Sequence, residues 1–239
     1  MISTEKLSKT YTRLKALDDV TIEFSRNECI ALIGPNGSGK TTLMKSILGM
    51  VVPDSGTIKF DNKDISGDWK YRSRIGYMPQ IGRYPDNMSI EQVIHMMKDI
   101  RKNEDLPLDE ELIEQFKLQS IYTKRMSTLS GGTRQKVSAS LAFLFNAEVL
   151  ILDEPTAGLD PLASEILKEK IICEKKKGKL IIISSHVLSE LDDLVTQIVY
   201  MQDGKIKYRN SIEQLRSETG ELKLSRSIAH LIRKEISNA

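Results

Sequence analysis

The chain has 239 residues, with 35 Lys and Arg against 33 Asp and Glu, so its formal net charge is +2. This length can bury a sizeable core in one large domain or two small ones. The near balance of charge does not indicate a nucleic-acid or anionic-membrane partner. The N-terminal residues lack the apolar core of a signal peptide, and no apolar run approaches the length that spans a bilayer. We therefore expect a cytosolic chain that acts at a membrane only through a partner.

The two cysteines, Cys29 and Cys173, both lie in apolar runs. Such surroundings predict buried free thiols in a reducing compartment rather than a disulfide.

The N-terminal part has the pattern of β-structure. Val20, Ile22 and Phe24 alternate with polar residues, which predicts a half-buried strand. Three further strands are predicted: an apolar run at residues 29–33, a short strand that enters a turn at residues 56–62, and a buried strand at residues 75–80. The last of these is closed by a proline, as the end of a strand allows.

A glycine-rich stretch joins the run at residues 29–33 to a helical segment at residues 42–48. It consists of Gly34, Pro35, Asn36, Gly37, Ser38, Gly39, Lys40 and Thr41. Strand, glycine-rich loop and helix are the context of a phosphate-binding P-loop. Glycines let backbone N–H groups turn toward phosphate oxygens, and the helix N-terminus adds the positive end of its dipole. In that role Lys40 reaches the β- and γ-phosphates and the Thr41 hydroxyl holds Mg²⁺. The alternative is a plain glycine turn.

Residues 81–128 differ in character from the preceding part. Apolar residues keep helical spacing at residues 90–97 and again at residues 112–116, and Pro107 separates the two patterns. No long strand pattern occurs here. We therefore expect a helical insertion between two parts of an α/β core.

The core pattern then resumes. Residues 149–152 and 180–183 are continuous apolar runs, as in parallel strands buried on both faces, and helices are expected between them. Residues 197–208 hold two β-runs separated by an Asp-Gly pair, the signal of a hairpin. The polar tail from Ser211 is predicted to be helical.

The predicted fold class is α/β: a P-loop NTPase core of a mixed sheet with helices on its faces and an N-terminal antiparallel part, plus an inserted helical subdomain.

Two carboxylates, Asp153 and Glu154, directly follow the run at residues 149–152. A P-loop NTPase needs a carboxylate at the carboxyl end of a strand to hold Mg²⁺. Asp153 suits that role, and Glu154 can polarise a water for in-line attack on the γ-phosphate. The alternative is an acidic turn before Pro155.

A second phosphate-type loop, Ser130-Gly131-Gly132, opens a helix expected to run through Ala142. Ser130 suits an N-cap, and the two glycines leave the helix N-terminus open to an anion. A capped helix start without a ligand is an equally good interpretation of this spacing. Two such loops fit one nucleotide site poorly. They fit well if each serves a different nucleotide, one in each subunit of a pair.

With these motifs in this order, the chain resembles the nucleotide-binding subunit of ATP-binding cassette (ABC) transporters from Met1 to about Lys207. Residues 34–41 match the Walker A loop, residues 149–154 match Walker B with its catalytic glutamate, and residues 129–132 match the LSGG signature. Thr133 stands where the family often has glutamine. Variation at this position is common in the family, so it does not indicate a loss of function. Gln80 falls at the Q-loop, Asp160 in the D-loop and His186 at the switch histidine.

The resemblance implies an ATP hydrolase that uses Mg²⁺. The implied catalytic residues are Lys40, Gln80, Glu154 and His186. The implied metal ligands are Thr41, Gln80 and Asp153. The implied nucleotide contacts are Tyr11, which stacks on adenine, then Gly34, Pro35, Asn36, Gly37, Ser38, Gly39, Lys40, Thr41 and Thr42, and finally Ser130, Gly131, Gly132 and Asp160. For Asp160 a competing interpretation is a cap of the helix that starts at Pro161.

The resemblance also implies partners. Two copies pack head to tail, and each ATP lies between the Walker A loop of one copy and the signature loop of the other. A separate membrane permease docks on the helical insertion, to which Gln80 links the γ-phosphate, and no nucleic-acid partner is expected. The implied domains are an ATP-binding core (1–80 and 129–210), the insertion (81–128) and a helical tail (211–239).

Methionines gather near the insertion: Met78, Met88, Met96 and Met97, beside His95. A soft metal such as Cu(I) is one interpretation, but a core or an adaptable interface is the stronger one. Separately, residues 76–85 resemble the ATPase of the copper-handling ABC system that matures nitrous oxide reductase. That resemblance concerns the cargo of a partner.

Two other function classes remain open. One is a soluble ABC ATPase that assembles or remodels proteins or clusters without a permease. The insertion is too short for the coiled coil of the repair ATPases, and translation-type members carry two cassettes. The other is a regulatory module that binds ATP but barely hydrolyses it, against which the presence of Glu154 and His186 argues.

Overall fold

The computed structural model describes residues 1–101 and 107–237 and, within the last helix, side chains up to residue 230. It divides into two compact units, Met1–Trp69 with Ile182–Ala239, and Lys70–Ile181. Residues 102–106 of the predicted insertion and 238–239 of the predicted tail lie outside the described part. The predicted boundaries after residues 80, 128 and 210 remain predictions.

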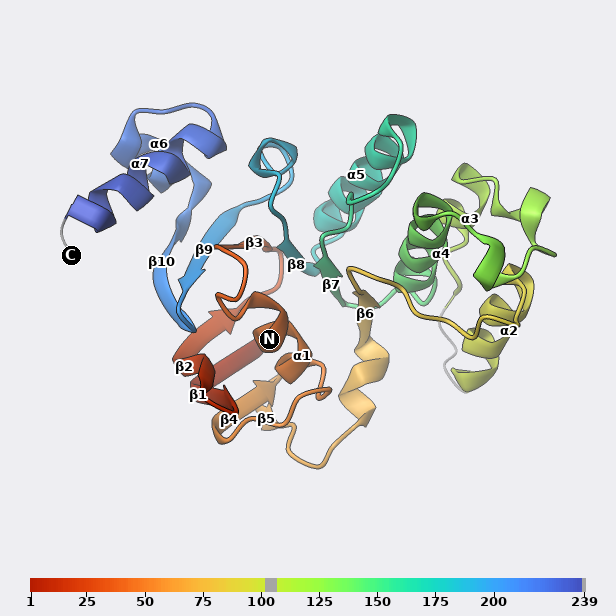
Figure 1. The fold of residues 1–239 in the computed structure, drawn as a ribbon, viewed down its shortest axis with the longest axis horizontal. Helices are drawn as coiled ribbons and strands as arrows, with labels where there is room; N and C mark the ends of the chain where they lie inside the picture. Colours follow the sequence, from red (N-terminus) through yellow and green to blue (C-terminus); the bar gives the residue numbers. More distant parts are fainter. Residues whose placement is uncertain (102–106, 238–239) are drawn as a thin grey trace. The chain divides into compact units, whose positions relative to one another are not determined.

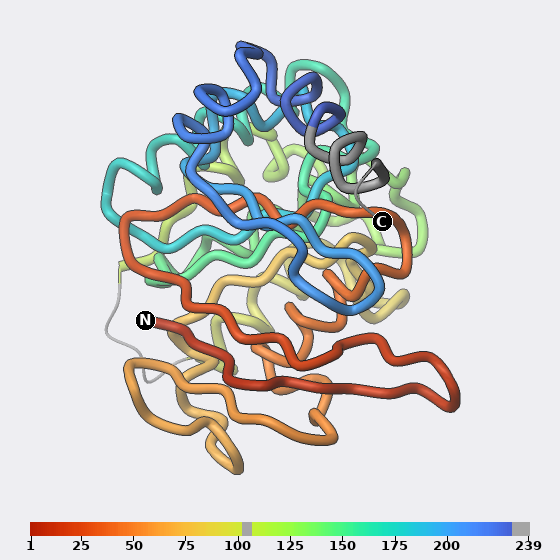
Figure 2. The backbone as a smooth tube through the Cα atoms, turned by 90° about the vertical axis from the view of Figure 1, so that its left-hand side faces the viewer, coloured from red at the N-terminus to blue at the C-terminus, as the bar shows by residue number. Residues whose placement is uncertain are grey.

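The first unit contains a four-stranded antiparallel sheet in the order β2-β1-β4-β5. Its strands are β1 (Ile2–Tyr11), β2 (Leu14–Phe24), β4 (Ser55–Phe60) and β5 (Lys63–Asp64). The long β1–β2 hairpin is visible in Figure 2 as two adjacent red runs. Val20, Ile22 and Phe24 are buried on one face of β2, as their alternation predicts.

The first unit also holds β3 (Cys29–Ile33), which is buried along its whole length and pairs in parallel with β9 (Gln197–Gln202). The latter forms an antiparallel hairpin with β10 (Lys205–Ser211). Asp203 and Gly204 turn this hairpin with φ of 50° and 74°, the left-handed conformation that a two-residue turn needs. The predicted hairpin is thus confirmed. The described part of this unit also contains the α-helices α1 (Lys40–Ile47), α6 (Ile212–Thr219) and α7 (Leu224–Ser237).

The second unit pairs β6 (Ile75–Met78) in parallel with β7 (Val149–Asp153). Its helices are α2 (Ile90–Ile100), α3 (Glu111–Gln115), α4 (Gly131–Phe143) and α5 (Pro161–Lys176), and Figure 1 shows α2 and α3 beside α4. Short 3₁₀ helices occupy Lys70–Arg74, Leu118–Ile121, Met126–Thr128 and, in the first unit, Leu188–Glu190. The boundary between the units falls within β8 (Leu180–Ser184).

Local sequence signals define where these helices begin. Ser89 and Gln92 form a capping box at α2, since each side chain bonds the backbone N–H of the other. At α5, the Asp160 carboxylate accepts a hydrogen bond from the Ala163 N–H at 2.9 Å, and Pro161 occupies the first helical position. In this unit Asp160 therefore caps α5, as the competing interpretation predicts.

The prediction of two buried thiols is half wrong. Both cysteines are free, but Cys29 is buried in β3 whereas Cys173 is exposed on α5. The buried face of this helix runs through Ala163, Leu167, Ile171 and Glu174, a helical spacing that leaves Cys173 outside it. The apolar neighbours of Cys173 therefore did not indicate its burial, because adjacent helical residues point in different directions.

Within residues 1–101 and 107–237, no helix combines the length and the apolar character that crossing a bilayer requires.

Candidate functional site

The glycine-rich loop lies between β3 and α1 in the first unit. Gly34, Gly37 and Gly39 have φ of 145°, 79° and 103°, a region that side chains disfavour. Helix α1 begins after Gly39 without a side-chain cap, which is the arrangement of an anion-binding helix N-terminus. The loop geometry is thus that of the predicted phosphate loop.

Lys40 is folded back over this loop. Its ammonium donates hydrogen bonds to the carbonyls of Gly34 at 2.8 Å and Pro35 at 3.1 Å, and it lies 3.5 Å from the Ser38 hydroxyl. The residue is only 7% exposed, so its charge is concentrated at the loop. A cation held there attracts phosphate oxygens more strongly than one in open solvent.

We expect Gly39→Ala to destabilise the protein by several kcal/mol more than Gly37→Ala. A Cβ at Gly39 would overlap the carbonyl oxygen of Ala16, whereas a Cβ at Gly37 meets no heavy atom within 4 Å. Both substitutions carry the left-handed backbone cost of about 1–2 kcal/mol, so the overlap accounts for the difference. Thermal unfolding of both nucleotide-free variants would measure it. Equal melting temperatures would contradict this packing argument.

Tyr11 ends β1 at the hairpin turn and is 43% exposed. It pairs with Leu14 across the hairpin, and two residues further along β2 the carbonyl of Ala16 faces Gly39. The hairpin end therefore lies near the phosphate loop. The ammonium of Lys9 lies 5.7 Å from the centroid of the Tyr11 ring.

His186 follows β8 in the first unit and is exposed. The Ser185 hydroxyl accepts a hydrogen bond from the Val187 N–H at 3.0 Å, which shapes the turn that carries His186.

The predicted carboxylates belong to the second unit. Asp153 ends β7 and Glu154 follows it, and they are 4% and 7% exposed. Met78 pairs with Leu152 in the parallel β6–β7 ladder, so Gln80 leaves β6 at the same edge where Glu154 leaves β7. Burial, and secondarily the charge of Asp153, raise the pKa of Tyr77 on β6 to about 12.

The second phosphate-type loop forms the N-terminus of α4. The Ser130 hydroxyl caps the helix by accepting the Thr133 N–H at 3.2 Å, as predicted, and it also bonds the Thr133 hydroxyl at 2.9 Å. Gly132 packs so closely against the Gly158 carbonyl that a Cβ would lie 2.7 Å from that oxygen. The close approach explains why glycine is required at position 132.

Two residues of α4 contact the site although sequence reasoning missed them. The Gln135 amide lies 3.4 Å from the Glu154 carbonyl, and the Lys136 ammonium lies 2.6 Å from the Asp160 carboxylate. The hydrogen bond from Lys136, followed by that from the Ala163 N–H, lowers the pKa of Asp160. The missed signal was the helical spacing, since Gln135 and Lys136, the fifth and sixth residues after the capping Ser130, lie in the first two turns of α4.

The methionine cluster separates into two places. Met78 is buried in β6, whereas Met88, His95 and Met96 line a cavity of about 820 Å³ along α2. Among the described residues no group of three or more His, Cys, Asp or Glu side chains is placed to hold a metal ion. The Cu(I) interpretation gains no further ligand from this arrangement and stays the weaker prediction.

Comparison with known proteins identifies the family of this chain. The ABC transporter family model matches residues 17–157. An ABC transporter ATP-binding protein of Bacillus subtilis strain 168, YxlF, is 33% identical over 223 residues, covering 91% of this chain and 73% of its own length. The lipopolysaccharide export system ATP-binding protein LptB of Haemophilus influenzae is 31% identical over 225 residues, covering 91% and 93%.

A solved structure titled as the ATP-binding subunit of an ABC transporter superposes with a TM-score of 0.87 at 29% identity, covering 97% of this chain and 99% of its own. The likeness confirms the predicted fold class. The copper-handling subfamily is not tested by these relatives and stays a prediction. The chain belongs to the ABC transporter family and is an ATP-binding, ATP-hydrolysing subunit of that family.

Proposed function

We propose that this chain powers the movement of a substrate through a separate membrane permease, by closing as a homodimer around ATP. The observation that carries the proposal is the presence of two phosphate-type helix N-termini in one chain. One is the glycine loop before α1, and the other is the Ser130 loop before α4. Two such loops serve one nucleotide well only if they come from different copies, which favours a head-to-tail pair with two-fold symmetry.

In this pair the phosphates of each ATP lie on the Walker A loop of one copy. The residues assigned to them are Gly34, Pro35, Asn36, Gly37, Ser38, Gly39, Lys40, Thr41 and Thr42. The other copy contributes Ser130, Gly131 and Gly132, and Asp160 lies near the seam. The Lys40 ammonium, which now bonds the loop carbonyls, would turn to the β- and γ-phosphates.

The donor set suits Mg²⁺. Thr41 offers a hydroxyl, Gln80 an amide oxygen and Asp153 a carboxylate, and Mg²⁺ prefers a few such oxygen ligands together with substrate phosphates. The metal would supply charge neutralisation on the β- and γ-phosphates. The chain's own residues position these groups and the attacking water.

Hydrolysis needs a base beside the γ-phosphate. We assign this role to Glu154, with Gln80 at the attacking water and His186 at the γ-phosphate. Lys40 and the N–H groups of the signature loop would neutralise the charge that develops in the transition state. ATP bridges the closed dimer and hydrolysis removes the bridge, so the cycle converts affinity for the closed state into movement.

The permease is assigned to the helical insertion at residues 81–128. The cavity along α2 supports this, because exposed Ile100 and the adaptable side chains Met88 and Met96 line it. Docking would hold the chain at the cytoplasmic face of the membrane. If residues 76–85 do mark the copper-handling subfamily, the cargo of that permease would be linked to copper.

A pull-down tests the proposal. Tagged Glu154→Gln protein, with ATP and Mg²⁺, should recover a multi-span membrane protein from native membranes. Ile100→Glu places a charge in the cavity along α2 and should reduce this recovery. Lys168→Glu changes charge on a different helix, α5, and serves as the matched control. Recovery of soluble proteins alone, with the bait folded and bound to ATP, would overturn the transport assignment and favour an assembly or remodelling ATPase.

A further inference from the structure

We propose that Lys9 and Asp54 are positioning residues for the nucleotide: they hold the Tyr11 ring so that a purine base can stack on the face that Lys9 leaves open. This inference rests on the proposed function, in which Tyr11 contacts the base. It adds two residues that bond neither the phosphates nor the metal.

Lys9 covers one side of the Tyr11 ring. Its ammonium lies 5.7 Å from the ring centroid, inside the range of about 6 Å for a cation–π contact. The Lys9 side chain is 19% exposed, so it is held against the protein, while Tyr11 remains 43% exposed. One face of an aromatic ring is thus occupied by a cation, and a substantial part of the ring stays accessible to a base.

Asp54 holds Lys9 in this place. One carboxylate oxygen lies 2.7 Å from the Lys9 ammonium, and the other accepts the Thr10 N–H at 2.7 Å. The Asp54 N–H donates to the Ser8 carbonyl at 2.8 Å. Asp54 therefore bonds three consecutive residues that lead into Tyr11. The hydrogen bond from Lys9, followed by that from Thr10, lowers the pKa of Asp54, so the carboxylate stays charged at neutral pH.

Lys9 and Asp54 together form a clamp on the residues before Tyr11. The Asp54 half of this clamp belongs to the segment that follows the phosphate-loop helix. Asp54 lies between the end of α1 and the start of β4, and the Met50 N–H of this segment bonds the Lys45 carbonyl within α1. The segment is thus hydrogen-bonded to α1 at Met50 and to the residues before Tyr11 at Asp54. Ordering the ring in advance lowers the entropic cost of binding the base.

The test separates the base from the phosphates. Full-length Lys9→Met and Asp54→Asn should each raise the Kd for ATP roughly three- to tenfold. The Kd for inorganic tripolyphosphate, which has no base to stack, should change less than about twofold. In steady-state hydrolysis KM for ATP should rise with little change in kcat. Lys9→Arg, which keeps a cation beside the ring, should retain the ATP affinity of the parent.

Lys59→Met is the matched control, because it removes another lysine from the same sheet, where Lys59 pairs with Glu5 at 3.9 Å. It should leave both affinities unchanged. In a Tyr11→Leu background, Lys9→Met should have no further effect on ATP binding, since the ring it positions is gone. Melting temperatures identify any variant that fails to fold, in which case the other member of the Lys9 and Asp54 pair supplies the measurement.

Three results would overturn the inference. Equal weakening of ATP and tripolyphosphate binding would show that the clamp supports the phosphate loop instead. An additive effect of Lys9→Met in the Tyr11→Leu background would separate Lys9 from the ring. Unchanged ATP affinity in both single variants would remove the role altogether. None of these affects the proposed function, which fails if the folded, ATP-bound Glu154→Gln protein recovers soluble proteins alone.

Discussion

Glu154→Gln is expected to reduce the rate of ATP hydrolysis by about 10²-fold or more while ATP binding persists. A general base contributes roughly 10²–10⁴-fold, and an amide of the same shape cannot accept the proton of the attacking water. The substitution also removes a negative charge from the position proposed for the γ-phosphate, so the ATP-bound dimer should accumulate. Single-turnover hydrolysis and size-exclusion chromatography with ATP and Mg²⁺ would measure both effects.

Glu165→Gln is the control for the same chemical change. Glu165 lies on α5 in the same unit, and its exposed carboxylate forms an ion pair with Lys168 at 2.9 Å. It should hydrolyse ATP at the rate of the parent. A Glu154→Gln protein that hydrolyses ATP as fast as the parent would show that Glu154 is not the base and would favour an alternative catalytic residue.

The backbone at Glu154 supports a functional role. Glu154 has φ of 52°, in the left-handed region where a glutamate costs about 1 kcal/mol or more. The residue is nevertheless buried at the end of β7, and the Gln135 amide lies 3.4 Å from its carbonyl. A strained conformation that the surroundings maintain is typical of active sites.

The sequence predicted the elements of the site better than the contacts that support them. The glycine loop, the carboxylate pair and the Ser130 cap depend on short-range patterns, and the structure has each at its predicted place in the chain. Lys9 and Asp54 are 45 residues apart, so only the pairing of β1 with β4 brings them together. Cys173 was misassigned because helical phase, rather than the polarity of its neighbours, decides burial.

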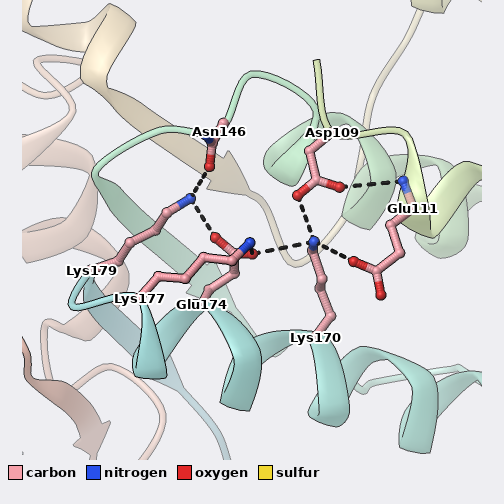
Figure 3. Close-up of polar contacts among 7 residues, drawn as sticks. All are labelled: Asp109, Glu111, Asn146, Lys170, Glu174, Lys177 and Lys179. Atoms are coloured by element: carbon pink, nitrogen blue, oxygen red, sulfur yellow. Dashed lines mark hydrogen bonds and ion pairs between the residues drawn. The ribbon is translucent and has the colours of Figure 1, made fainter. Parts of the chain in front are cut away.

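A buried ion network on α5 could not be predicted from the sequence either, because lysines on a helix usually face solvent. The Lys170 ammonium bonds Asp109 at 2.5 Å and Glu111 at 2.7 Å and lies 3.2 Å from Glu174, as Figure 3 shows. The side chains of Lys170 and Glu174 are each 1% exposed. These bonds tie α5 to the segment that begins α3, so they hold part of the helical insertion in place.

The two charges of this network are stabilised by their partners. Burial alone would lower the pKa of Lys170, but the hydrogen bonds to Asp109 and Glu111 hold it above its usual value. Burial alone would raise the pKa of Glu174, but hydrogen bonds from Lys177 and Lys179 and the charges of Lys179 and Lys170 lower it to about 2. Both groups are therefore ionised at neutral pH, and each depends on the others.

Lys170→Met is accordingly expected to lower the free energy of unfolding by about 3–5 kcal/mol and the melting temperature by roughly 10 °C. The substitution keeps the length of the side chain but leaves three carboxylates without their shared cation. Thermal unfolding followed by circular dichroism at pH 7 would measure the loss. Lys168→Met, two residues earlier on α5, removes an exposed pair with Glu165 and should cost less than about 1 kcal/mol.

The pH dependence distinguishes a charge effect from lost packing. The pKa of Glu174 is depressed in the folded protein, so its stabilisation is complete above the unfolded value near 4.5 and is lost as pH falls toward about 2. Protonation of the carboxylates removes the charges that Lys170 compensates. The stability difference between Lys170→Met and the parent should therefore stay constant from pH 7 to about pH 5 and shrink below it. A difference that persists at acid pH would show that the lysine stem contributes by packing alone, because packing does not titrate.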